Sequence, residues 1–141
     1  MRDRDKIKRL LVEGTTVICD RYYHSGVVYS AAKQNPDLPL SWARTPDSGL
    51  PKPDAVIFLD LAEEIAQQRG GWGGERYEKA DLQRRVRDLF KGLTYTEGGW
   101  LKSDAEGLEV VDAGRDMESV ANAIWEVVRL VKLDGGVKSV E

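Results

Sequence analysis

With 141 residues, the chain has the length of one domain and enough sequence to bury a substantial core. It is 41% hydrophobic and 32% charged, which is typical of a soluble globular protein, and its net charge of −3 argues against a broad basic surface for nucleic acid. One cysteine excludes an internal disulfide and no apolar stretch is long enough for a membrane helix, so we expect a soluble intracellular protein that binds neither membrane nor nucleic acid.

Hydrophobic periodicity predicts helices that alternate with strands. In chain order these are an amphipathic helix over the first dozen residues ending near Gly14, a strand at 15–19, a helix at 25–33, a strand at 55–59, helices at about 62–69 and 79–93, a strand at 108–111 and a helix at about 116–133. The buried stripe expected in the last helix is Val120, Ala121, Ile124, Val128 and Val131. Apolar strands separated by helices are typical of a parallel sheet covered on both faces, so we expect one α/β domain with a flexible tail at 134–141.

The sequence lacks the residues that several enzyme classes need. Its single histidine, His24, stands beside Tyr23, where a packing or surface role is favoured over a role as a base. Its single cysteine, Cys19, lies within a predicted strand. A Ser-His-Asp or Cys-His arrangement and a Cys/His zinc site are therefore not expected.

Charged residues and glycines gather at two points. Asp20 and Arg21 follow a predicted strand, and in open parallel sheets ligands bind beyond the carboxyl ends of the strands. Arg69 and Arg76 flank the glycine-rich residues 70–74, and a guanidinium group matches phosphate oxygens. Each feature alone is also typical of a solvated turn or a mobile surface loop. Together they favour phosphoryl transfer, which depends mainly on positioning and electrostatics.

The order and spacing of several motifs make the pattern specific. They are Asp20-Arg21-Tyr22, Ser25-Gly26, Lys33, Pro46-Asp47-x-Gly49-Leu50-Pro51-Lys52-Pro53-Asp54, Arg69-Gly70 and Glu75-Arg76-Tyr77-Glu78. From about residue 7 to residue 133 the sequence resembles the thymidylate kinases, in particular the eukaryotic, fungal-like form. The run at residues 49–54 argues against a different nucleotide kinase of the same fold.

The resemblance implies an enzyme that transfers the γ-phosphoryl group of ATP to dTMP, giving dTDP, with Mg²⁺. The implied fold is the three-layer parallel α/β sheet of the P-loop nucleoside monophosphate kinases, which commonly dimerise. The implied catalytic and binding residues are Arg21 on the 5′-phosphate of dTMP, Asp20 near Mg²⁺ through water, Tyr22 in the substrate site, Ser25, Gly26 and Tyr29 along the thymine pocket, Arg69 and Arg76 in a lid over the transferring phosphoryl group, and Tyr77 and Gln83 near the sugar. The proline-rich residues 46–53 are expected to be a rigid connection.

One motif of these kinases is missing. The sequence does not contain G-x-x-x-x-G-K-[ST], whose backbone amides and lysine hold nucleotide phosphates. We therefore expect this chain to match the carboxyl-terminal two-thirds of such an enzyme, with the central P-loop strand missing from an incomplete sheet. Unpaired buried strand edges are costly, so the 141 residues by themselves are predicted to fold poorly or to oligomerise. Without the phosphate cradle, negligible dTMP kinase activity is expected.

Two interpretations stay open at this point. The favoured one is that these residues belong to a complete thymidylate kinase, because Asp20, Arg21, Arg69 and Arg76 are all present. The alternative is a short, non-catalytic module that binds a nucleotide or a partner, with an exposed sheet edge as its interaction surface. No basic targeting cluster stands out, so the expected location is the cytoplasm or the nucleus.

Overall fold

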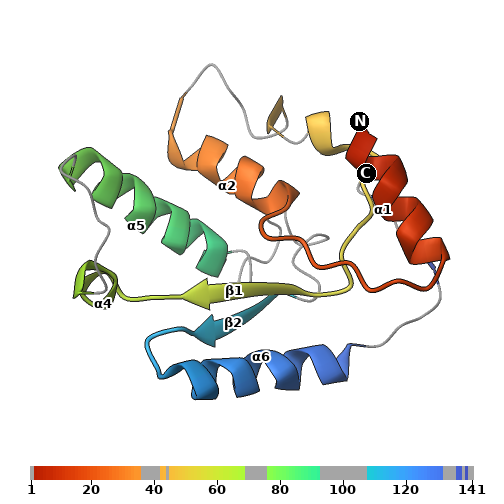
Figure 1. The fold of residues 1–141 in the computed structure, drawn as a ribbon. Helices are drawn as coiled ribbons and strands as arrows, with labels where there is room; N and C mark the ends of the chain where they lie inside the picture. Colours follow the sequence, from red (N-terminus) through yellow and green to blue (C-terminus); the bar gives the residue numbers. More distant parts are fainter. Residues whose placement is uncertain are drawn as a thin grey trace. The chain divides into compact units, whose positions relative to one another are not determined.

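The computed structural model describes residues 2–35, 42–43, 45–68, 76–92, 108–131, 136–137 and 139 (Figure 1). The chain forms two compact units, Met1–Pro53 together with Leu133–Glu141, and Asp54–Lys132. The predicted single domain over residues 1–133 stays a prediction. Residues 70–74, expected to hold no regular element, lie outside the described residues. Among the described residues, no helix is long and apolar enough to cross a membrane.

The first unit begins with helix α1, Arg2–Val12, as the amphipathic pattern predicts. Gly14 ends this helix with a φ of 78°, a conformation that favours glycine. The amide of Gly14 donates to the Leu11 carbonyl at 3.0 Å, and the amide of Thr15 donates to the Leu10 carbonyl at 2.9 Å. This pair of hydrogen bonds is a Schellman motif, which satisfies carbonyls that the helix leaves open at its end.

Residues 15–19 do not form the predicted strand, so this prediction is wrong. In the described part of the first unit, no segment forms a ladder of hydrogen bonds with them. The side chains are accordingly not buried: Ile18 is 91% exposed, and Cys19 is exposed as well. A β-branched, apolar segment favours extended backbone, but it becomes a strand only when a neighbouring strand pairs with it.

The exposure of Cys19 leads to a direct chemical test. As the only cysteine, it is expected to react with a maleimide in the native protein nearly as fast as in urea. A buried strand residue would instead be protected until the protein unfolds. Native labelling slower than labelling in urea by a factor of about 100 or more would contradict the exposed conformation. Mass spectrometry at timed quenches measures both rates on the same sample.

Helix α2, Tyr23–Ala32, carries most of the core of the first unit. Val27, Val28 and Ala32 are each only 1% exposed, and Tyr23 is also buried. The buried side chains therefore anchor the helix that follows the turn at Asp20-Arg21-Tyr22. A short 3₁₀ helix, η1 (Thr45–Asp47), lies in the proline-rich connection. Farther along the chain, Pro51 pairs with Ser139 in an isolated antiparallel bridge, which ties one described residue of the predicted flexible tail to this unit.

The second unit contains a parallel pair of strands, β1 (Val56–Asp60) and β2 (Leu108–Asp112). Their register pairs Val56 with Leu108 and Asp60 with Asp112. Helices α5 (Arg76–Gly92) and α6 (Met117–Leu130) lie on opposite sides of this pair (Figure 1). The helix–sheet–helix layering confirms the predicted α/β class, and the two-stranded sheet agrees with the expectation of an incomplete one.

The side of the sheet facing α5 has an aromatic contact at its centre. The Phe58 ring stacks on the Phe90 ring with centroids 4.6 Å apart, and Val86 and Phe90 of α5 are both buried. A short helix, α4 (Glu63–Gln68), follows β1. The helix predicted at 79–93 is α5, which starts three residues earlier than expected.

On the opposite side of the sheet, helix α6 keeps more of its apolar side chains exposed than α5 does. Asp116 caps α6 by accepting hydrogen bonds from the Ser119 amide at 2.9 Å and the Ser119 hydroxyl at 2.6 Å. The buried stripe predicted for this helix is wrong, because none of its residues is buried. Trp125 is 63% exposed and Val128 is 46% exposed. A sheet of two strands offers too little surface to bury the apolar face of this helix.

Candidate functional site

The turn at Asp20-Arg21-Tyr22 leads directly into α2, and its backbone is unusual. Arg21 has a φ of 65°, in the left-handed region that non-glycine residues rarely occupy. Such a conformation costs about 1–3 kcal/mol and is found preferentially at functional sites. Asp20 and Arg21 are both exposed to solvent. The turn therefore presents a carboxylate and a guanidinium side by side after residues 15–19, although those residues do not form the strand that the sequence predicts before it.

The first turn of α2 suits an anion. Its N-cap residue, Tyr22, makes no capping hydrogen bond with its side chain, and the first turn holds no acidic residue. Amide groups at a helix N-terminus point outward and attract negative charge. Arg21, immediately before this turn, adds a full positive charge with fixed donor geometry. The local charge at this turn therefore favours an anion over a cation.

Tyr22 connects this turn to the proline-rich segment. Its hydroxyl donates a hydrogen bond to the Pro51 carbonyl at 3.0 Å, and its ring meets the Tyr23 ring edge-on at 5.1 Å. Burial raises the pKa of the Tyr22 hydroxyl, with smaller contributions from Cys19 and Asp47, so the group stays a donor at neutral pH. Its hydroxyl therefore has a structural role, in keeping with the rigid connection predicted for residues 46–53.

His24 lies in the core of the first unit. It is 4% exposed, and its ring stacks on Tyr23 with centroids 3.9 Å apart. The favoured packing role for this histidine agrees with both observations.

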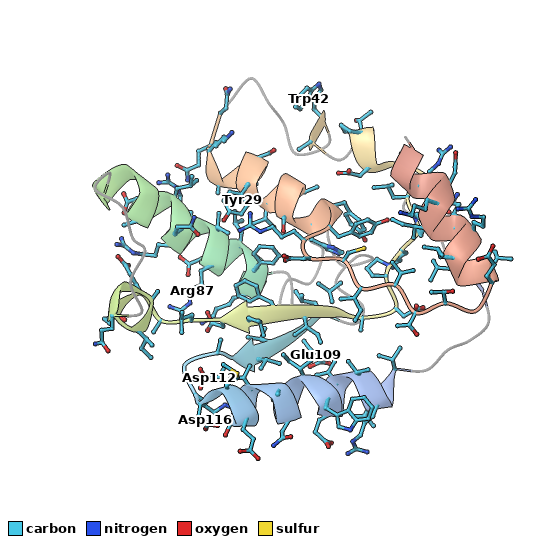
Figure 2. The ribbon with its side chains drawn as sticks, in the orientation of Figure 1. Tyr29, Trp42, Arg87, Glu109, Asp112 and Asp116 are labelled. Atoms are coloured by element: carbon cyan, nitrogen blue, oxygen red, sulfur yellow. The ribbon has the colours of Figure 1, made fainter. Side chains whose placement is uncertain are left out.

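Three predicted substrate residues share one face of α2. Tyr29 follows Gly26 by three positions and Ser25 by four, the spacings that place helical side chains next to each other. Tyr29 lies on α2 (Figure 2), and the guanidinium carbon of Arg21 lies 5.9 Å from the centre of its ring. The structure thus brings together Arg21, Tyr29 and the start of α2.

The other predicted site residues belong to the second unit. Gln83 is exposed on α5. Arg76 and Tyr77 form the first turn of that helix, while their side chains, like the whole of Arg69, lie outside the described residues. Within the described part of the chain, no group of three or more His, Cys, Asp or Glu residues could hold a metal ion.

An ion-pair cluster at the carboxyl end of β1 is absent from the sequence-based predictions. Asp60 accepts hydrogen bonds from Arg87 through both carboxylate oxygens, one of them at 2.9 Å, and pairs with Lys91 at 2.8 Å. The Asp60 side chain is only 14% exposed. The signal was a strand ending in an acid, followed by two basic residues four apart on one helix face. This cluster fastens α5, which begins with Arg76 and Tyr77, to the sheet.

The cluster makes stability depend on pH in a defined direction. Hydrogen bonds from Arg87, followed by those from Lys91, lower the pKa of Asp60 below its ordinary value of 3.8. A carboxylate with a lowered pKa stabilises the folded state above the unfolded pKa, and this contribution is lost as the pH falls through the folded pKa. The urea midpoint of the native chain should therefore exceed that of Asp60→Asn by a constant amount from pH 7 to pH 5. Below about pH 4 the gap should shrink; a gap that stays constant down to pH 2.5 would contradict the effect.

Comparison with known proteins identifies the family of this chain. The family model for thymidylate kinase matches residues 2–124. The chain belongs to the thymidylate kinase family. The resemblance noted from the motifs is thereby confirmed.

Individual thymidylate kinases match most of the chain. The one from Caenorhabditis elegans is 41% identical over 121 residues, which cover 86% of this chain and 50% of that protein. The one from Homo sapiens is 40% identical over 128 residues, covering 91% of this chain and 54% of that protein. The solved structure of thymidylate kinase from Candida albicans superposes with a TM-score of 0.76 at 29% identity, covering 98% of this chain and 67% of that one. The chain spans about half the length of the curated relatives it matches.

Proposed function

We propose that this chain supplies the dTMP-binding part of a thymidylate kinase, an enzyme that converts dTMP and ATP into dTDP and ADP. The observation that carries the proposal is the position of Arg21 at the start of α2, in a chain of this family. Arg21 would grip the 5′-phosphate of dTMP, together with amides of the first turn of α2. Ser25, Gly26 and Tyr29 would line the thymine pocket on the same helix face.

In the proposed reaction, a phosphate oxygen of dTMP attacks the γ-phosphorus of ATP, the bond to the bridging oxygen breaks, and ADP leaves. The attacking oxygen is already anionic, so no general base is required, and the packing role of His24 is consistent with this. Arg69 and Arg76 would neutralise charge on the transferring group from the lid, with Tyr77 and Gln83 near the sugar. Positioning and electrostatics of this kind supply most of the catalysis in phosphoryl transfer.

Mg²⁺ suits the exposed carboxylate of Asp20. This cation prefers oxygen ligands, keeps several waters, and binds through one or two carboxylates together with substrate phosphates. A single acid at the phosphate site fits that preference, whereas a full protein cage does not occur among the described residues. When bound, Mg²⁺ would neutralise phosphate charge, and Asp20 would orient its water shell.

Calorimetric titration with dTMP tests the proposal. The 141-residue chain is expected to bind one dTMP saturably, and to bind thymidine, which lacks the phosphate, and dAMP, which lacks thymine, at least about tenfold more weakly. A chain that binds no dTMP, or binds all three ligands equally, would contradict the assignment. Because the sequence has no G-x-x-x-x-G-K-[ST] motif, dTDP formation by these residues alone is expected to stay below detection. Clear turnover by pure material would overturn that expectation.

The exposed extended segment at residues 15–19 favours a second candidate, a non-catalytic binding module. Fragment complementation distinguishes the two. The chain is mixed with the part of the Schizosaccharomyces pombe thymidylate kinase that the match leaves out; the matched part is 54% of that protein. Recovery of dTDP formation supports the kinase, whereas dTMP binding without any recovery supports the module.

A further inference from the structure

The contact between Arg21 and Tyr29 brings together a residue of the turn and a residue of the helix. The Arg21 guanidinium carbon lies 5.9 Å from the centre of the Tyr29 ring, within the range of a cation–π interaction. Arg21 holds this contact from a left-handed backbone conformation, with a φ of 65°. Tyr29 sits on a helix anchored by the buried residues Val27 and Val28. A flexible cation is therefore held against a ring that belongs to a rigid element.

Whether Arg21 contacts a carboxylate or an aromatic ring affects how readily it can bind phosphate. No ion pair joins Arg21 to a carboxylate in the part of the chain that the structure describes. An arginine bound to a carboxylate must break that pair before it can bind phosphate. An arginine against an aromatic face keeps the donors in the guanidinium plane available for a bidentate contact. The ring can thus fix the side chain without occupying its hydrogen-bonding edge.

We propose that Tyr29 is a positioning residue, which holds the Arg21 guanidinium ready for the phosphate of a nucleoside monophosphate. This inference rests on the proposed function and adds a role for Tyr29 besides any contact with the base. Ordering a long side chain before the ligand arrives removes part of the entropic cost of binding. The free chain would hold Arg21 in the conformation that binds the ligand.

The test compares Tyr29→Leu with Tyr29→Phe, which keeps the ring and loses only the hydroxyl. Titration with dTMP is expected to show about two- to fivefold weaker binding for Tyr29→Leu and a smaller change for Tyr29→Phe. The decisive step is a double-mutant cycle. In an Arg21→Gln background, Tyr29→Leu should no longer weaken dTMP binding if it acts through the guanidinium. An equal loss in both backgrounds would mean that Tyr29 contacts only the base, and would overturn the inference.

Two further measurements separate this inference from the proposed function. Inorganic phosphate, which has no base, should bind Tyr29→Leu more weakly than Tyr29→Phe; equal affinities would overturn the positioning role even if dTMP binds. The NMR resonance of the Arg21 Nε–H should move on Tyr29→Leu substitution in the free chain, because a nearby ring shifts it, and should move less in Tyr29→Phe. An unmoved resonance would contradict the contact itself. A native chain that binds phosphate with this pattern but shows no preference for dTMP would refute only the proposed function.

Discussion

Replacing Arg21 by alanine is expected to weaken dTMP binding about 10- to 100-fold, because hydrogen bonds to a charged group contribute about 1.5–3 kcal/mol. Arg21 is exposed and lies at the uncapped start of α2, so its loss should not unfold the first unit. Arg21→Lys should lose less affinity, since it keeps the charge but not the fork of donors. Calorimetry with dTMP measures all three chains under the same conditions.

Arg9→Gln serves as the matched control for Arg21→Ala. It removes one positive charge from an exposed site on α1, in the same unit. We expect its dTMP affinity to stay within about twofold of the native chain at physiological ionic strength, since salt weakens the effect of an exposed charge. If Arg21→Ala loses no more affinity than Arg9→Gln, Arg21 does not bind the phosphate.

Replacing Asp60 by asparagine is expected to lower the free energy of unfolding of the second unit by about 2 kcal/mol at pH 7. The carboxylate is 14% exposed, while Arg87 and Lys91 are 35% and 41% exposed. Removing the Asp60 carboxylate leaves the two cations, Arg87 and Lys91, near each other without their shared anion. Their partial exposure to water keeps the loss below the 3–5 kcal/mol of a fully buried pair. Urea unfolding followed by circular dichroism measures the change.

Glu109→Gln is the matched control for the Asp60 variant. Glu109 is an exposed carboxylate on β2 of the same sheet (Figure 2). Its replacement should change the stability by no more than about 0.5 kcal/mol, as is usual at surface positions. Equal urea midpoints for the two variants would show that the Asp60 cluster contributes nothing to fastening α5.

Local patterns explain why most elements could be predicted from the sequence. Gly14 ends α1 and Asp116 starts α6, and each does so through hydrogen bonds with residues only a few positions away. The turn at Arg21 was predicted from its place after an apolar run, and the structure does place it at the start of α2. The lid residue Arg69 stays a prediction. The ion-pair cluster of Asp60 was missed, because an acid after a strand and two bases on a helix make contact only when α5 packs on β1.

The amino-acid sequence by itself determined the helices, the strands β1 and β2 as local elements, and the family. These depend on periodicity, caps and motifs, which act over short stretches of chain. Only the tertiary structure decided that residues 15–19 are exposed rather than in a strand, that no residue of α6 is buried, and that Arg21 lies against Tyr29. The physical reason is the same in each case. Pairing, burial and side-chain contact depend on which other segment lies alongside, and that neighbour is not encoded in the local pattern.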